Sequence, residues 1–221
     1  MSSTRLPGKV LMKLDAREVL GHIIARYQRL DFVDKILIAT SDSHDDDQIS
    51  CFAQKNGIAL SRGSLENVLD RVYRCATEYS LDLIIRHTAD NIFLDSSLLK
   101  KAINVSKSFD LEKPFIISSR GGIIPIGMDI EVFNFLALAL AQVQAQSMYD
   151  REHVTPFLYS SAKVLKKSIG NSFQPKSDLS VPTCTLDTSS DLIAVNSYLE
   201  WLNGRDSTVE NCYEWWRTKG S

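Results

Sequence analysis

The stretch Leu83-Ile84-Ile85-Arg86-His87-Thr88-Ala89-Asp90 joins a short apolar run to a polar segment that ends in a carboxylate. Such a run is typical of a buried strand, and similar runs occupy residues 36–39, 58–60 and 115–117. Between these runs the apolar residues recur at helical spacing. Strands that alternate with helices form βαβ units in a parallel sheet covered on both faces. We therefore predict the α/β fold class.

The composition excludes several classes of protein. The chain has 221 residues and 24.8 kDa, and its net charge of -2 at pH 7 lacks the basic footprint of a nucleic-acid-binding protein. Hydrophobic residues make up 44% and charged residues 24%, which excludes a disordered or collagen-like chain. The apolar stretch 135–141 is much shorter than the roughly 20 residues that span a bilayer. The polar N-terminus lacks the apolar core of a signal peptide. The four cysteines are widely spaced, at Cys51, Cys75, Cys184 and Cys212, which predicts reduced thiols. Together these features predict a cytoplasmic protein with no membrane insertion.

The second half of the sequence is less regular. Residues 128–133 alternate like a strand, and a helix is predicted at 135–146, with another beginning near Arg151. A polar loop then precedes a last short strand at 183–186. Two C-terminal helices are predicted at 191–202 and 209–216. We expect one domain over 1–221 with an inserted excursion at about 120–180.

Two carboxylates stand at the carboxyl ends of predicted strands, where ligands bind in open α/β sheets. Asp90 follows the run 83–85, and Asp187 follows 183–186. Together they suit a Mg²⁺ ion that also contacts phosphate oxygens. Asp90 has two other interpretations, a helix cap and an ion pair with Arg86. For Asp191 a place in the first turn of a capped helix is expected.

The segment Ser3-Thr4-Arg5-Leu6-Pro7-Gly8-Lys9 has the composition of a phosphate-binding loop. Gly8 permits close backbone approach, Ser3 offers donors, and Arg5 and Lys9 supply two cations. On composition alone a solvated N-terminus is favoured, because the segment matches neither a Walker A loop nor a dinucleotide fingerprint. Asp129 and Glu131 alternate in the 128–133 run. They would share one strand face, which is either part of a substrate site or a solvated surface.

Seven motifs, taken in order, resemble sugar cytidylyltransferases. This family includes acylneuraminate and 3-deoxy-manno-octulosonate cytidylyltransferases, and the similarity is greatest to its spore coat polysaccharide biosynthesis branch. The motifs are Ser3-Thr4-Arg5-Leu6-Pro7-Gly8-Lys9-Val10-Leu11; Ala39-Thr40-Ser41-Asp42 with Asp46-Asp47; Arg62-Gly63-Ser64 with Val68-Leu69-Asp70-Arg71; Arg86 with Thr88-Ala89-Asp90; Gly127 with Asp129-Ile130-Glu131-Val132-Phe133; Arg151-Glu152-His153-Val154-Thr155-Pro156; and Leu186-Asp187-Thr188 with Asp191-Leu192.

The resemblance implies a three-layer α/β/α, Rossmann-like nucleotide-diphospho-sugar transferase fold with a mostly parallel sheet. It implies an enzyme that transfers CMP from CTP to an acidic or amino sugar with Mg²⁺ as cofactor, for surface polysaccharide or glycan biosynthesis. Its partners would be CTP, a sugar and, as in many relatives, a second copy of the chain. The implied residues are Arg5, Lys9 and Asp90 for catalysis; Ser3, Arg5, Gly8, Lys9, Thr40, Ser41, Arg62, Gly63, Ser64 and Arg86 for the nucleotide; Asp129 and Glu131 for the sugar; and Asp90 and Asp187 for the metal.

The sequence also departs from the family pattern. The family has a short apolar strand ending in Ala-Arg before the phosphate loop, and the given sequence begins after that position, so this first strand is expected to be missing. Residues 91–93 replace the usual Cys-Pro-Leu, and His87 replaces an apolar residue. Two alternatives therefore stay open, namely a glycosyltransferase that uses a nucleotide-sugar and a truncated, non-catalytic relative of the fold.

Overall fold

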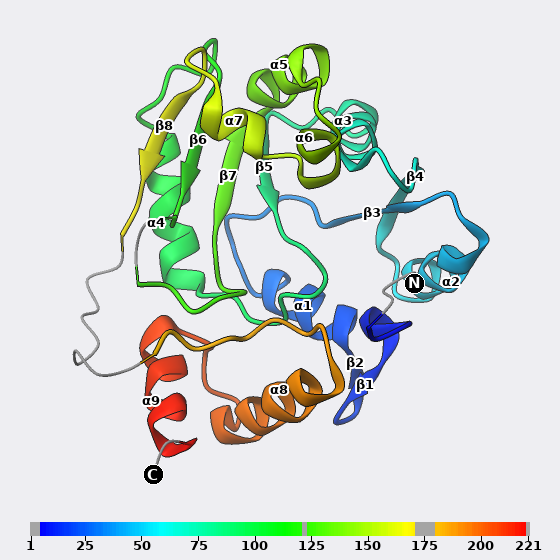
Figure 1. The fold of residues 1–221 in the computed structure, drawn as a ribbon, viewed down its shortest axis with the longest axis vertical. Coiled ribbons are helices and arrows are strands. Elements are labelled where there is room, and N and C mark those ends of the chain that lie inside the picture. Colours follow the sequence, from blue (N-terminus) through cyan, green and yellow to red (C-terminus); the bar gives the residue numbers. More distant parts are fainter. Residues whose placement is uncertain (1–4, 121–122, 171–179, 220–221) are drawn as a thin grey trace.

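The computed structural model describes residues 5–120, 123–170 and 180–219. Its strands form two larger groups, with β3 and β4 towards one side of the molecule and the second group towards the other (Figure 1). In the first group, β3 (Leu37–Ser41) runs parallel to β4 (Ala59–Gly63). The second group is a four-stranded sheet in the order β5-β7-β6-β8. Its strands are β5 (Leu83–Arg86), β6 (Phe115–Ser118), β7 (Glu131–Asn134) and β8 (Leu165–Ser168).

Strand β7 makes the four-stranded sheet a mixed one. It runs antiparallel to both β5 and β6, whereas β6 and β8 run parallel. Strands β5 and β6 consequently point the same way although they are not neighbours. A small hairpin of β1 (Lys13–Leu14) and β2 (Arg17–Glu18) lies apart from both groups.

Helices cover both faces of the four-stranded sheet, and its side chains alternate between two cores. Phe115, Ile117 and Val132 belong to the core on the α4 side, whereas Ile116 and Phe133 belong to the core beneath α5 and α7. This arrangement has three layers, which confirms the predicted α/β fold (Figure 1). The helices are α1 (Val19–Tyr27), α2 (Asp47–Lys55), α3 (Val68–Glu78), α4 (Ser96–Ser106), α5 (Phe135–Gln144), α6 (Met148–His153), α7 (Pro156–Ser160), α8 (Ser189–Leu202) and α9 (Val209–Lys219), with 3₁₀ helices η1 (Lys9–Leu11) and η2 (His44–Asp46).

Several predicted boundaries are wrong. Strand β7 begins at Glu131, so Asp129 precedes it and does not share a strand face with that residue. Residues 183–186 form no strand and contribute only single bridges, through Thr183 and Thr185. Strand β8 was not predicted, because all four of its residues are exposed and two are lysines. Of the predicted excursion, residues 121–122 and 171–179 lie outside the described part, and the domain division stays a prediction.

No helix among the described residues is both long and apolar enough to cross a membrane. All four cysteines are free thiols. The buried Cys184 and Cys212 lie close together, with their sulfur atoms 3.1 Å apart. This contact packs α9 against the segment that leads to Asp187.

Candidate active site

Lys9 is the centre of a cluster of four charged side chains. Its Nζ donates a hydrogen bond to Asp187 Oδ1 at 2.8 Å and lies 3.6 Å from Asp90 Oδ2. Arg5 approaches the other oxygen of Asp187, with its Nη2 3.4 Å from Oδ2. Only 13% of the Lys9 side chain is exposed, against 65% for Arg5. The structure thus brings two cations and two carboxylates together from three distant parts of the sequence.

Gly8 sets the position of Lys9. It has a φ of 71°, in the left-handed region that glycine adopts at little cost, and it immediately precedes η1. Behind the turn, Val10 and Leu11 pack against a buried apolar cluster of α1 and α2 side chains, and Ile38 of β3 and Leu60 of β4 pack against the same cluster. The apolar side chains therefore hold the loop against the strands, while the backbone turn directs Lys9 towards the carboxylates.

The two carboxylates are brought together by backbone pairing between their segments. Leu186 N donates to Asp90 O at 2.8 Å, and Asn91 forms an antiparallel bridge with Thr185. On the far side of Asp187, the Thr188 hydroxyl accepts from Asp191 N, and Asp191 Oδ2 accepts from Thr188 N. This capping box begins α8, which confirms the predicted place of Asp191 in its first turn.

Asp90 and Asp187 differ in how their charges are satisfied. The hydrogen bond from Lys9, aided by the charges of Lys9 and Arg5, holds the pKa of Asp187 below its ordinary value. Asp90 Oδ1, in contrast, is buried without a hydrogen-bond partner among the described residues. An unpartnered carboxylate oxygen at this position is available to a cation. The helix-cap interpretation of Asp90 does not hold, because Asp95 caps α4, and Arg86 forms its ion pair elsewhere.

The predicted base and ribose residues meet at the carboxyl ends of β3 and β4, where Thr40 pairs with Arg62 and Ser41 with Gly63. The hydroxyls of Thr40 and Ser41 both donate to the buried carboxylate of Asp46, at 2.8 and 2.6 Å. Their hydroxyl protons are therefore engaged inside the protein.

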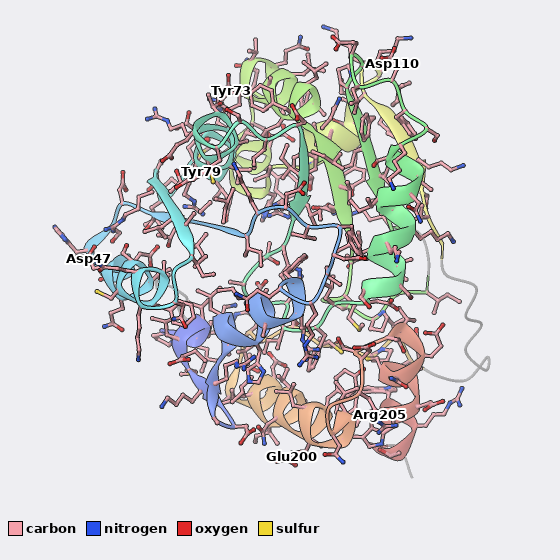
Figure 2. All side chains as sticks on the ribbon, turned by 180° about the vertical axis from the view of Figure 1, so that it is seen from behind. Asp47, Tyr73, Tyr79, Asp110, Glu200 and Arg205 are labelled. Carbon is pink, nitrogen blue, oxygen red and sulfur yellow. The ribbon has the colours of Figure 1, made fainter. Side chains whose placement is uncertain are left out.

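Arg62 braces the loop that follows β3. Its guanidinium donates to Ser41 O, to Ser43 O and, at 2.6 Å, to Asp47 Oδ1. Figure 2 shows Asp47 at the outer edge of this part of the molecule. Ser64 lies at the start of the next loop, where its hydroxyl accepts from Asn67 N. The sequence did not assign these side chains a role in shaping the loop.

Glu131 has a second network of hydrogen bonds. Its Oε2 accepts from Arg86 Nη1 at 3.1 Å, and its Oε1 accepts from the hydroxyls of Thr155 and Tyr159 at 3.0 and 2.9 Å. Burial and the charge of Glu131 raise the pKa of Tyr159, so this hydroxyl stays protonated and donates. Since Glu131 is itself buried, its interpretation as part of a solvated strand face is wrong. Thr155 lies within the sixth sequence motif. That motif was the only sequence signal for the part that Thr155 plays in this network.

Asp129 is exposed just before β7. Surrounding protein atoms weaken the hydration of its carboxyl and, together with the negative charge of Glu131, raise its pKa. Arg120 opposes this shift, and its guanidinium stacks on the Tyr159 ring, 4.2 Å from the ring centre. A basic and an acidic side chain therefore lie beside the buried Glu131 network.

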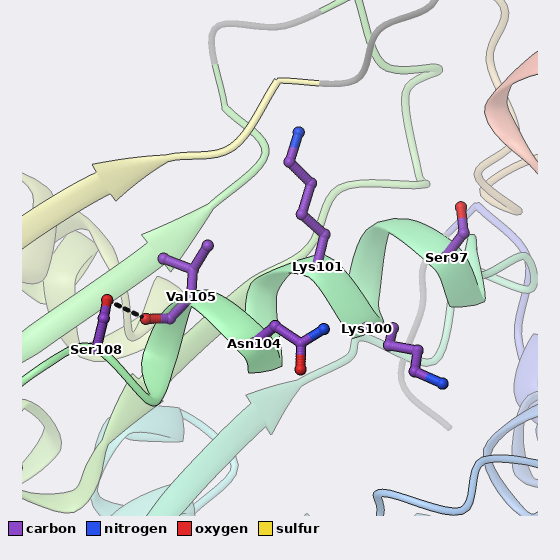
Figure 3. Close-up of a pocket in the computed structure, with 6 residues that line it drawn as sticks. All are labelled: Ser97, Lys100, Lys101, Asn104, Val105 and Ser108. Atoms are coloured by element: carbon purple, nitrogen blue, oxygen red, sulfur yellow. Dashed lines mark hydrogen bonds between the residues drawn. The ribbon is translucent and has the colours of Figure 1, made fainter.

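Other parts of the molecule are less suitable as an active site. Ser3 of the predicted phosphate loop lies outside the described residues. A surface hollow along α4 is lined by Lys100, Lys101 and neighbouring polar residues (Figure 3), and it contains none of the predicted site residues. Within the described part of the chain, no group of three or more His, Cys, Asp and Glu side chains is arranged to hold a metal.

Comparison with known families places most of the chain in one family. The family model described as Cytidylyltransferase matches residues 1–186, from the loop before Lys9 to the residue before Asp187. The chain belongs to the cytidylyltransferase family. This membership confirms the resemblance that the seven motifs indicated.

Individual members of the cytidylyltransferase family show how far the similarity extends. Uncharacterized protein MJ1063 of Methanocaldococcus jannaschii is 36% identical over 164 residues, which are 74% of this chain and 65% of that protein. Spore coat polysaccharide biosynthesis protein SpsF of Bacillus subtilis is 34% identical over 163 residues, covering 72% of this chain and 66% of that protein. The matched region thus spans just under two thirds of the length of these relatives.

The fold of the cytidylyltransferase family is also seen in solved structures. A cytidylyltransferase from Leptospira borgpetersenii has a TM-score of 0.85 and 24% identity, covering 100% of this chain and 91% of that one. At this identity the match supports the shared fold. It covers every described element, including α8 and α9, which follow the region matched by the family model.

Proposed function

We propose that the protein transfers CMP from CTP to a sugar, giving a CMP-sugar and pyrophosphate for surface polysaccharide or glycan biosynthesis. The observation that carries this proposal is the placement of Lys9 between Asp90 and Asp187, with Arg5 beside them. Membership of the cytidylyltransferase family and similarity to SpsF support the choice of nucleotide and the biosynthetic role. CTP is a cytoplasmic metabolite, so we place the reaction in the cytoplasm.

The reaction is a substitution at the α-phosphorus of CTP. A sugar hydroxyl oxygen forms the new bond to this phosphorus, the bond to the pyrophosphate oxygen breaks, and the hydroxyl proton passes to solvent. Catalysis of such a transfer consists mainly of positioning and charge neutralisation. Arg5 and Lys9 would bind the triphosphate, and Gly8 would allow its oxygens to approach the backbone.

The charge of the cluster explains why a divalent cation is part of the proposal. Arg5 and Lys9 together balance Asp90 and Asp187, so the cluster has no surplus positive charge for a triphosphate. The buried, unpartnered Oδ1 of Asp90 fits a cation ligand. Asp90 and Asp187 would hold Mg²⁺, which supplies positive charge to the phosphate oxygens when bound.

The rest of the nucleotide would lie against the carboxyl ends of β3 and β4. The braced loop from Ser41 to Asp47 and the segment from Arg62 to Ser64 would contact cytosine and ribose, mainly through backbone groups. Thr40 and Ser41 would maintain this surface through Asp46. Arg86 would support the site by fixing Glu131.

The sugar would bind beside β7. Asp129 is accessible there, and Glu131 would hold the wall of the site through Thr155 and Tyr159. The adjacent Arg120 and Asp129 offer one cation and one anion, which suits a sugar of acidic or amino character. In addition, we propose that the working protein is a homodimer.

A coupled assay of pyrophosphate release tests the proposed function. The chain is incubated with CTP, Mg²⁺ and, in turn, nonulosonic acids, octulosonic acids and amino sugars. We expect release that depends on the sugar, and loss of release in Asp90→Asn and Asp187→Asn without unfolding. Asp110→Asn, a change in an exposed surface carboxylate, serves as the control. Absence of release with every sugar class, or full activity in both site variants, would contradict the proposal.

A further inference from the structure

Two of the four cysteines form a buried pair. Cys184 and Cys212 are 2% and 0% exposed, and their sulfur atoms lie 3.1 Å apart although the residues are 28 positions apart in the sequence. Cys51 is exposed, and Cys75 is buried elsewhere, on α3. A single buried thiol behaves as a small apolar side chain, whereas two thiols in contact can also react with one another.

Cys184 is held by the backbone around it. Its N–H donates to Ile126 O at 2.7 Å. Gly127 passes so close that a Cβ there would lie 3.0 Å from the Cys184 carbonyl carbon. Three residues later the same segment reaches Asp187 of the candidate site. The position of the Cys184 sulfur is therefore tied to the backbone that carries Asp187.

Cys212 is held from a different side. It lies in the first turn of α9, where its N–H donates to Thr208 O at 3.0 Å. At the start of the same helix, Val209 N donates to the buried carboxylate of Asp95 at 2.9 Å, and this carboxylate also caps α4. The two sulfurs therefore meet where two separately anchored parts of the fold come together.

We propose that Cys184 and Cys212 are an oxidation site, at which a peroxide converts the two thiols into a reversible intramolecular disulfide that crosslinks α9 to the Asp187 segment. Hydrogen peroxide would oxidise one thiol to a sulfenic acid, with cleavage of the O–O bond and release of one water. The other thiol would then attack this sulfur, forming the S–S bond and releasing a second water. The two sulfurs together lose the two electrons that the peroxide gains. They need to move only about 1 Å closer to reach disulfide bonding distance.

The burial of the pair controls how it reacts. The thiolate is the reactive form of cysteine, and the hydrogen bond with Cys212, together with burial, raises the pKa of Cys184 well above its ordinary value. The first oxidation therefore requires local opening of α9 or of the Asp187 segment. The second step joins two sulfurs that the fold has already placed together. The exposed Cys51 needs no such opening, so it should react with peroxide before the pair does.

The disulfide would close a loop from Cys184 to Cys212 that contains Asp187 and the whole of α8. Helices α8 and α9 lie together at one end of the molecule (Figure 1). A crosslink stabilises a protein mainly by restricting its unfolded chain, and the effect grows with the length of the closed loop. Oxidation should therefore stabilise this end of the molecule without placing a new group in the candidate site. The inference does not depend on nucleotide binding.

Peptide mapping after peroxide treatment tests the proposal. The full chain is treated with hydrogen peroxide, its remaining thiols are blocked with iodoacetamide, and the covalent monomer is isolated on a denaturing gel without reductant. Trypsin cleaves after Arg205, so Cys184 and Cys212 fall on different peptides that only a disulfide keeps joined. We expect joined peptides from the wild type and their separation by dithiothreitol. The urea midpoint of the oxidised chain should be about 1 M higher than that of the reduced chain.

Cys75→Ser is the matched control, because Cys75 is also a buried thiol (5%) but belongs to α3. It should keep both the joined peptides and the rise in the urea midpoint, as should Cys51→Ser. Cys184→Ser and Cys212→Ser should lose both, while circular dichroism checks that each variant stays folded.

Absence of joined peptides at a peroxide concentration that fully oxidises Cys51 would overturn the proposal. So would joined peptides without a rise in the urea midpoint, or an equal rise on peroxide treatment of Cys184→Ser and Cys212→Ser. None of these outcomes depends on whether the proposed reaction occurs.

Discussion

Individual residues of the candidate site were predicted from the sequence, but most of their contacts were not. Asp90 and Asp187 were assigned from their places after apolar runs, and the structure brings them to the same cation, Lys9. The contact between Lys9 and Asp187 joins residues 178 positions apart. No local pattern encodes such a contact, because it depends on how the strands are ordered in space. The same reason explains why the partners of Glu131 were missed.

The ion pair at Asp187 leads to a prediction about its protonation. Lys9→Met should raise the pKa of Asp187 towards the ordinary value of 3.8, because the main hydrogen bond that lowers it would be lost. Carboxyl carbon chemical shifts measured during a pH titration report this value directly. Lys9→Arg, which keeps the charge, should leave the pKa low. An unchanged pKa in Lys9→Met would show that Lys9 does not stabilise the Asp187 carboxylate.

His87 leads to a prediction about stability and pH. Burial lowers its pKa below 6.5, and its Nε2 donates to Asn91 O while Nδ1 accepts from Tyr27 OH. Below pH 6.5 the unfolded chain binds a proton that the folded chain does not, so stability falls as the pH falls.

His87→Gln keeps a donor for Asn91 O and removes this titration. Urea unfolding at several pH values gives the slope of the free energy of unfolding against pH. Below the ordinary histidine pKa, this slope should be smaller in His87→Gln than in the wild type by up to about 1.4 kcal/mol per pH unit. His44→Gln is the control, since the His44 side chain is fully exposed and pairs with Asp47. Equal slopes in the wild type and His87→Gln would refute the assignment.

At the scale of helices and strands, apolar sequence patterns predicted some strands and missed others. Strands β3, β5 and β6 were predicted within two residues and β4 within three, because buried strands require apolar runs. Strand β8 was missed because an exposed edge strand carrying Lys166 and Lys167 has no apolar signal. Residues 183–186 have a strand-like composition but form only isolated bridges. Thr183 bridges to the loop before β7, whereas Thr185 bridges to the segment after Asp90. Because the two bridges go to different segments, neither is extended into a strand.

The close packing of Gly127 against this segment gives a test at the scale of the element. A Cβ at Gly127 would lie 2.8 Å from Thr185 Cγ2 and 2.9 Å from Thr185 N, whereas one at Gly57 would meet nothing within 4 Å. Both glycines have positive φ. Gly57→Ala should therefore cost about 1 kcal/mol of stability, from backbone conformation alone.

Gly127→Ala should cost a further 1–3 kcal/mol or so, because overpacking is added to the conformational cost. It should also displace Asp187 through residues 184–186. Urea unfolding of the two variants measures the difference, and CTP affinity reports the displacement. Equal losses of stability at Gly57 and Gly127 would show that the 183–186 segment does not require the close approach.

The capping box of α8 gives a second test of an element. Thr188→Ala should lower the free energy of unfolding by about 1 kcal/mol, since the Asp191 N–H would lose its acceptor. Thr188→Ser should restore most of this loss because serine caps equally well. Ser190→Ala is the neighbouring control, because its hydroxyl bonds that of Thr188 and, among the described residues, accepts from no backbone N–H. A Thr188→Ala variant as stable as the wild type would contradict the cap.

For the molecule as a whole, the predicted α/β class and family resemblance are confirmed, whereas the mixed sheet was not foreseen. The antiparallel course of β7 follows from long-range pairing with β5 and β6. The central claim is that Arg5, Lys9, Asp90 and Asp187 form one binding site for a magnesium nucleotide.

Calorimetric titration of the chain with CTP in the presence of Mg²⁺ tests this claim most directly. The account predicts binding by the wild type and by Asp110→Asn. It also predicts affinity at least about tenfold weaker in Asp90→Asn and in Asp187→Asn, because each change removes a charged ligand of the cation. Absence of CTP binding by the wild type, or equal affinity in all four proteins, would contradict it.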